Sequence, residues 1–157
     1  MATTSIRVGM GYDVHQLVPG RELWMGGIQL DHDLGLLGHS DADVLIHAIC
    51  DAILGAANMR DIGYHFPDTS AETEGMDSKI ILRKTIELIA TKGYRLVNID
   101  ATICAERPKM NPISLPCSSA WRKSSAAMPM PFLSRQPPPR NSASLVVRKV
   151  SLHTLLL

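Results

Sequence analysis

Three polar side chains in the first third of the chain have the types and the spacing of a metal site. Asp13 and His15 lie two apart in the segment Gly-Tyr-Asp-Val-His, and His47 follows a second polar cluster at residues 38–43. Alternate residues of a strand share a face, so a strand here would point Asp13 and His15 at a common atom. With His47 they supply one oxygen and two nitrogen ligands, the set expected of a catalytic zinc with one open position.

His47 has acidic neighbours on its own predicted helix. Asp43 lies one turn before it and Asp51 one turn after it, so its ring can meet a carboxylate on either side. Such a carboxylate could orient the imidazole toward a metal. A histidine beside acidic residues is also a common surface salt bridge, and the spacing alone leaves both interpretations open.

Two positions have the character of phosphate contacts. Ser40 is a predicted helix N-cap, with Asp43 as the third residue of a capping box, and the free N–H groups of a helix start suit an anion. Lys109 lies in a Pro-Lys turn and could meet a diphosphate. Each has a plain alternative: Ser40 as a cap alone, and Lys109 as a solvated side chain.

Composition places the chain among ordinary globular proteins. Its 157 residues suit one domain, and 16 basic against 15 acidic residues leave a net charge of +1, which gives no electrostatic reason to expect nucleic acid or an anionic membrane as partner. No apolar run reaches membrane-spanning length, and no secretion signal is expected at the amino terminus. Cys50, Cys104 and Cys117 are odd in number and lack zinc-type pairing, which favours free thiols in a reducing cytoplasm.

The pattern of apolar residues predicts a mixed fold. Helices are expected to begin at Ser40 and at Asp77 or Ser78, and to end near Gly55 and Gly93. Extended segments are expected at 6–13, 22–30 and 97–105, with a loop at 61–69. Two helices against a sheet with one apolar face imply a two-layer α+β sandwich in a single domain.

Four motifs, in order and spacing, closely resemble the 2-C-methyl-D-erythritol 2,4-cyclodiphosphate synthase family. The resemblance covers residues 6–112, about two thirds of the chain, and is carried by residues 7–15, 36–48, 61–69 and 105–110. It implies a homotrimer of two-layer α/β subunits with active sites at the subunit interfaces. The implied reaction converts 4-diphosphocytidyl-2-C-methyl-D-erythritol 2-phosphate to the cyclic 2,4-diphosphate with release of CMP, in non-mevalonate isoprenoid biosynthesis.

The same resemblance assigns roles by position. It implies zinc on Asp13, His15 and His47, and a second divalent ion, magnesium or manganese. His39 would stabilise the transition state and, with Ser40, touch the substrate phosphates. Contacts with the erythritol moiety would come from Asp61, Ile62 and Gly63, and from the loop Phe66, Pro67, Asp68, Thr69 and Ser70, where Ser70 stands in place of the acidic residue frequent in relatives. The cytidine diphosphate, at the site shared with a neighbouring subunit, would meet Ala105, Glu106, Arg107, Pro108, Lys109, Met110 and Asn111.

The resemblance stops at Pro112. The family should continue with a histidine and a helix, then a strand leading to Thr-Thr-Thr-Glu, whose glutamate holds the second ion; residues 113–157 contain none of these. Residues 113–144 are rich in serine and proline without a helical or strand period, as in a disordered tail. The chain therefore divides into a synthase domain at 1–112 and an anomalous tail at 113–157.

The genetic code offers an origin for the tail. If each codon takes the last base of one residue and the first two of the next, residues 136–140 can be re-read as Thr-Thr-Thr-Glu, and 140–147 as Lys-Leu-Gly-Phe-Thr-Gly-Arg. Our hypothesis is that 113–157 is an out-of-frame version of the domain's last helix and strand. A chain without that central strand would fold poorly or be inactive, because domains are stable by only a few kcal/mol.

Two other functions remain open from the sequence. One is another zinc-dependent phosphohydrolase that uses Asp13, His15 and His47 and would release inorganic phosphate. The other is an inactive trimeric nucleotide-binding protein, favoured if the printed tail is real.

Overall fold

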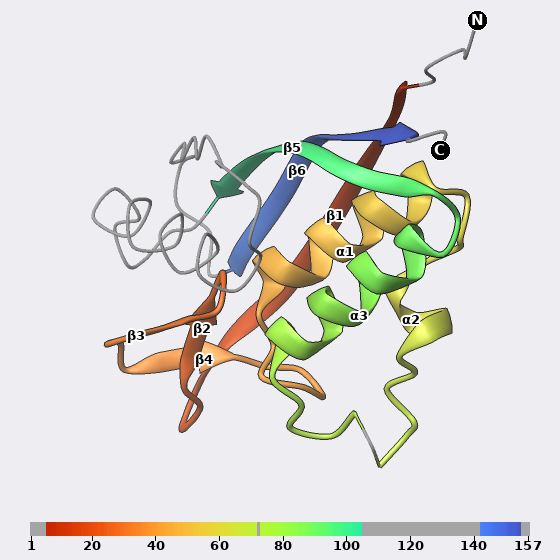
Figure 1. Cartoon of the computed structure of the whole chain (residues 1–157). Helices are drawn as coiled ribbons and strands as arrows, with labels where there is room; N and C mark the ends of the chain where they lie inside the picture. Colours follow the sequence, from red (N-terminus) through yellow and green to blue (C-terminus); the bar gives the residue numbers. More distant parts are fainter. Residues whose placement is uncertain (1–5, 72, 105–141, 155–157) are drawn as a thin grey trace, which may run out of the picture.

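The structure is a computed structural model that describes residues 6–71 and 73–104 and the backbone of residues 142–154 (Figure 1). In this part of the chain no helix has the length and apolar character needed to cross a membrane. The elements, in chain order, are β1 (Ile6–Pro19), β2 (Leu23–Met25), β3 (Ile28–Leu30), β4 (Leu34–Leu36), α1 (Val44–Ala56), α2 (Ile62–His65), α3 (Ser78–Ala90), β5 (Tyr94–Cys104) and β6 (Ser142–Thr154).

A four-stranded antiparallel sheet carries the fold, in the order β4-β1-β6-β5. Helices α1 and α3 lie side by side on one face of it (Figure 1). Between the layers lies one apolar core, in which Leu45, Ile49 and Ile53 of α1 and Ile99 and Ile103 of β5 are fully buried or nearly so. The predicted mixed α/β fold in a single domain is confirmed.

The extended stretch predicted at 22–30 is a separate hairpin of two short strands, β2 and β3. Gly26 and Gly27 form its turn with φ of 63° and 78°. A two-residue turn with both φ values positive matches the twist of antiparallel strands, and glycine adopts it without steric cost.

The prediction that Ser40 caps the first helix is wrong. Asp43 is the N-cap of α1, and its side chain accepts a hydrogen bond from the Ile46 N–H. The chain turns sharply before the helix, with Ala42 at a φ of 58°, so the helix begins three residues later than expected. The predicted cap of the second helix is confirmed, since Asp77 is the N-cap of α3.

Strand β5 departs from the regular alternation expected at 97–105. Its pairing with β6 shifts register between Leu96 and Asn98 and again between Asp100 and Ala101. A bulge moves the following side chains to the other face. As a result Leu96 is buried and Val97 is 40% exposed, although the sequence pattern places Val97 on the apolar face.

The prediction that the chain lacks its last central strand is wrong for the backbone. Residues of β6 pair with both β1 and β5, so that Gly11 lies opposite Val147 and Asp13 opposite Leu145. Ladder hydrogen bonds use main-chain groups, which any non-proline sequence supplies, and the segment is rich in valine, which favours strands. The out-of-frame origin of the tail stays a hypothesis, and residues 113–141 lie outside the described part.

The face of β1 that points away from α1 is apolar and open. Ile6, Val8, Met10, Tyr12 and Val14 alternate along the strand, and all are exposed, Met10 by 71%. An exposed apolar face of this kind is a candidate interaction surface.

Candidate active site

The three predicted metal ligands come together at the junction of β1 and α1. One ligand atom from each of Asp13, His15 and His47 can be chosen so that all lie within 4.8 Å of one another. Asp13 and His15 share a face of β1, as the strand period predicts, and His47 reaches them from α1. This part of the site is confirmed as a group able to hold a metal ion.

Each imidazole turns one nitrogen toward the Asp13 carboxylate. Asp13 Oδ2 lies 3.0 Å from His15 Nε2 and 3.2 Å from His47 Nδ1. The other nitrogen of His15, Nδ1, lies 2.5 Å from the carbonyl oxygen of Leu37. A carbonyl can only accept, so Nδ1 carries the hydrogen and Nε2 of a neutral ring offers its lone pair to an ion. A carboxylate oxygen and two imidazole nitrogens fit zinc with one position open to a ligand.

Without an ion, the cluster behaves as an ion pair. Burial alone would raise the pKa of Asp13, but the hydrogen bonds and charges of His15 and His47 outweigh it and hold that pKa below its ordinary value of 3.8. The hydrogen bond to Asp13 raises the pKa of His15 above 6.5, although burial opposes it. The carboxylate therefore stays anionic and attracts a cation, which in the metal-free chain is the protonated imidazole.

The carboxylates beside His47 in the helix do not orient it, contrary to the sequence prediction. Asp43 is turned the other way, toward the backbone N–H groups of Gly26 and Gly27. Asp51 accepts from the N–H of Ile62 at 2.8 Å.

The partners of His47 Nε2 are instead two hydroxyl groups, Ser40 Oγ at 3.1 Å and Ser78 Oγ at 3.0 Å. The sequence indicates Ser78 only as a possible start of the second helix, because it lies 31 residues from His47 and no local pattern joins the two.

Ser40 lies beside the three predicted metal ligands, and His39 precedes it in the chain. Ser40 is 6% exposed, and its hydroxyl oxygen also accepts from the N–H of Ala42 at 3.3 Å. His39 is exposed, and its Nε2 lies 3.2 Å from the carbonyl oxygen of Ser70. The structure thus joins the two predicted phosphate contacts to the metal cluster on one side and to the 66–70 loop on the other.

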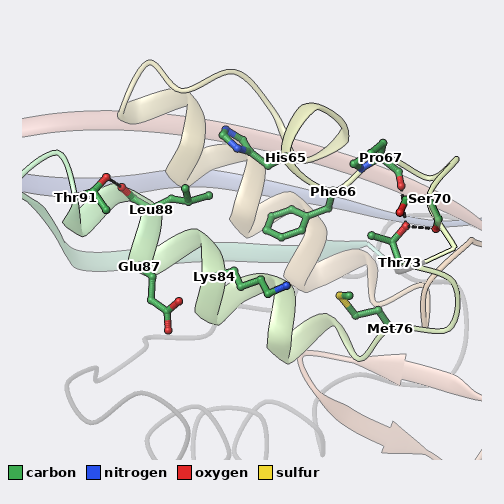
Figure 2. A pocket seen from close by; sticks show the side chains of 10 residues that line it. All are labelled: His65, Phe66, Pro67, Ser70, Thr73, Met76, Lys84, Glu87, Leu88 and Thr91. Atoms are coloured by element: carbon green, nitrogen blue, oxygen red, sulfur yellow. Dashed lines mark hydrogen bonds between the residues drawn. The ribbon is translucent and has the colours of Figure 1, made fainter.

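The predicted loop at 61–69 contains the short helix α2, capped by Asp61, whose Oδ1 accepts from the N–H of Tyr64 at 2.8 Å. A cavity of about 430 Å³ follows, between the chain after α2 and helix α3 (Figure 2). Phe66 and Lys84 point into it from opposite sides, and Pro67 and Ser70 also line it. Of the other predicted erythritol contacts, Asp61, Ile62, Gly63, Asp68 and Thr69 are not part of its described lining, nor are the metal ligands.

The remaining predicted contacts, Ala105 to Asn111 with Lys109 among them, lie outside the described residues. Cys50 and Cys104 are free thiols, as expected, and burial raises the pKa of Cys50 to about 12, which keeps it protonated. Cys117 also lies outside the described part.

The sequence is similar to those of known proteins. A 2-C-methyl-D-erythritol 2,4-cyclodiphosphate synthase of Bacteroides thetaiotaomicron is 77% identical over 105 residues, which are 67% of this chain and 66% of the relative. A synthase of the same name from Parabacteroides distasonis is 74% identical over 107 residues, 68% of this chain and 66% of the relative. The chain therefore matches slightly less than two thirds of the length of these relatives.

Solved structures show the same fold. The bifunctional IspDF from Campylobacter jejuni superposes with a TM-score of 0.90 at 28% identity, over 98% of this chain and 43% of that chain. A 2C-methyl-D-erythritol-2,4-cyclodiphosphate synthase in its CDP-bound form superposes with a TM-score of 0.80 at 27% identity, over 96% of this chain and 100% of the other. The model of the YgbB family matches residues 6–122, so the chain belongs to the YgbB family.

Proposed function

We propose that this protein is a metal-dependent 2-C-methyl-D-erythritol 2,4-cyclodiphosphate synthase that releases CMP. The observation that carries the proposal is the convergence of Asp13, His15 and His47 on one point, in a chain 77% identical over 105 residues to a relative with that name. The free thiols of Cys50 and Cys104 support a reducing, cytoplasmic setting.

In the proposed reaction an oxygen of the 2-phosphate forms a bond to the β-phosphorus, and the bond from the β-phosphorus to the oxygen shared with the α-phosphate breaks. CMP leaves with that oxygen. Two anionic phosphates must approach each other in line, so their mutual repulsion and their orientation dominate the barrier. Zinc, when bound, supplies Lewis-acid stabilisation of charge on a phosphate oxygen.

The chain's own residues hold the reacting groups. Asp13, His15 and His47 form the metal-binding site, or metal seat. The Ser40 hydroxyl, next to that seat, donates to a phosphate oxygen, and the exposed His39 ring stabilises charge that develops in the transition state. We propose that the site also binds a second divalent ion, magnesium or manganese. The glutamate that holds this ion in the family is absent from the printed sequence.

The substrate's remaining parts are assigned to the loops. We infer that Asp61, Ile62 and Gly63 contact the erythritol hydroxyls, together with Phe66 to Ser70. A cavity lies between this loop and α3 (Figure 2). Residues 105–111 take the cytidine diphosphate at the boundary with the neighbouring subunit.

We further infer that the protein is a homotrimer with active sites at the subunit interfaces. The open apolar face of β1, with Met10 71% and Ile6 66% exposed, supports assembly through this side of the sheet. A charge there should dissociate the assembly. Met10→Glu is expected to sediment as a smaller species than the wild type, whereas Lys92→Glu, at an exposed site after α3, keeps the wild-type mass. An assembled Met10→Glu protein would contradict this surface.

One assay separates the proposed function from its alternatives. The protein is incubated with the diphosphocytidyl substrate, zinc and magnesium, and the products are resolved by chromatography. CMP with the cyclic diphosphate supports the synthase, inorganic phosphate supports a phosphohydrolase, and no product supports an inactive nucleotide-binding protein. His47→Asn should reduce CMP release by at least about 100-fold, since loss of even an outer partner of a metal ligand costs about 10–100-fold. His32→Gln, in the loop after β3, is the matched control and should keep wild-type rates.

A further inference from the structure

The ring of His47 is held at both of its nitrogens. Nδ1 lies 3.2 Å from Asp13 Oδ2, on the side of the metal seat, and Nε2 lies 3.0 Å from Ser78 Oγ. A neutral imidazole carries one hydrogen, so Nδ1 can offer a lone pair to an ion only when Nε2 carries the hydrogen. The Asp13 carboxylate can accept a hydrogen from Nδ1, so an acceptor for Nε2–H favours the form of His47 that can bind an ion.

Ser78 Oγ can accept from His47 Nε2–H but cannot donate to it, because its own hydrogen is already donated elsewhere. Its hydroxyl donates to Asp41 Oδ1, and a carboxylate accepts hydrogen bonds without donating. The lone pairs of Ser78 Oγ remain for His47 Nε2–H. The hydrogen bonds thus run in one direction, from the imidazole to the hydroxyl to the carboxylate.

Asp41 is fixed in place by the backbone around it. Its Oδ2 accepts from the N–H of Ser78 at 2.9 Å, and its Oδ1 accepts from the N–H of Asp43 at 3.2 Å. The N–H of Asp41 donates to the carbonyl of Met76, and the N–H of Gly75 donates to the carbonyl of His39. Ser78 itself is fully buried. The two segments 39–41 and 75–78 are therefore joined into one rigid support.

The same arrangement affects Ser40. Its oxygen lies 3.1 Å from His47 Nε2 and accepts from the N–H of Ala42. When an ion takes the lone pair of Nδ1, Nε2 carries the hydrogen and cannot accept the hydrogen of Ser40. The Ser40 hydroxyl can then donate to an anion beside the metal seat.

We propose that Asp41 and Ser78 are positioning residues, which fix the His47 tautomer with Nδ1 toward the metal and leave the Ser40 hydroxyl free to donate to a phosphate. The inference rests on the metal seat of the proposed function, and its test needs zinc but no substrate. Ser78 lies at the start of α3, so the proposal gives that helix a part in the site that neither its sequence pattern nor the spacing of the ligands indicates.

The test is the affinity for zinc alone, measured by competition with a chromophoric chelator. Ser78→Ala and Asp41→Asn are expected to raise the dissociation constant by about 10–100-fold, and Ser78→Thr by much less. Thr85→Ala is the matched control: it removes another fully buried hydroxyl from α3 and should leave zinc affinity unchanged.

A Ser78→Ala protein with wild-type zinc affinity would overturn the proposal, as would equal losses in Ser78→Ala and Thr85→Ala. If the wild type itself binds no zinc, the metal part of the proposed function fails, and the inference fails with it.

Discussion

A methyl group at Gly11 would overlap the carbonyl oxygen of Ala48, one residue after His47 in α1. Gly11 thus sets the distance of closest approach between β1 and α1, and with it the reach of His47 toward Asp13. Gly9 has the same relation to the carbonyl of Ala52, one turn further along the helix. Two glycines therefore let a strand and a helix approach closely enough to share a metal seat.

Gly11→Ala should weaken both the fold and the site. Moving the helix away costs about 1–3 kcal/mol in free energy of unfolding, as for other overpacked cores, and should lower zinc affinity. Urea denaturation and chelator competition measure the two effects. Gly55→Ala is the control: a Cβ there meets no atom within 4 Å, and the change should stabilise α1 by about 0.5–1 kcal/mol. A fully stable Gly11→Ala protein would show that the close approach is dispensable.

The stability of the metal-free protein should depend on pH through Asp13 and His15. The lowered pKa of Asp13 contributes stability above 3.8 that is lost as pH falls toward the folded value. The raised pKa of His15 contributes stability that is complete below 6.5 and is lost as pH rises through the folded value. The contribution of the pair is therefore largest between these two ordinary values.

Urea denaturation from pH 5 to 9 tests this dependence. Without metal, the wild type should lose stability above pH 6.5, and His15→Gln should lose less. With zinc in excess, stability should instead increase as the pH rises, because deprotonation of the imidazoles favours metal binding. Equal pH profiles for wild type and His15→Gln would remove His15 from the ion pair.

The Asp43 carboxylate is expected to contribute strongly to the stability of the fold. It is fully buried and accepts from the N–H groups of Gly26, Gly27 and Ile46, so it joins the β2–β3 hairpin to the start of α1. Asp43→Ala is expected to cost about 3 kcal/mol or more in free energy of unfolding, because it strands buried donors and removes a helix cap. Asp43→Asn keeps one acceptor oxygen and should cost less.

Asp77→Ala removes the partly exposed N-cap of α3 and serves as the comparison for the loss of a cap alone. We expect it to cost about 1 kcal/mol in free energy of unfolding. Equal losses for Asp43→Ala and Asp77→Ala in thermal or urea unfolding would mean that the hairpin contacts of Asp43 add nothing.

The tail can be tested by mass. We expect the active protein made from the natural gene to have the intact mass of the in-frame tail, with Thr-Thr-Thr-Glu in place of residues 136–140. A measured mass equal to that of the printed 17.2 kDa chain, from a sample with full cyclase activity, would refute the out-of-frame hypothesis. Expression of both versions side by side, with the CMP assay on each, separates the effect of the tail from that of the metal seat.

Local pattern alone determined several parts of this protein. The period of a strand puts Asp13 and His15 on one face, the polar residues before an apolar helix place its cap at Asp77 or Ser78, and four motifs in fixed order identify the family. The shared face and the cap depend on residues close together in the chain, where backbone geometry by itself decides which side chains are neighbours, and each motif is a short run of residues.

Tertiary structure decided the rest, because it depends on packing between distant segments. His47 meets Asp13 only because glycines let α1 lie close on β1, and its outer nitrogen is held by Ser78, 31 residues away. The helix cap is Asp43, which the sequence assigned a different role, because the hairpin supplies two further N–H groups for its carboxylate. The last strand forms although its sequence departs from the family, since a gap between two strands can be filled by main-chain hydrogen bonds that any suitable segment supplies.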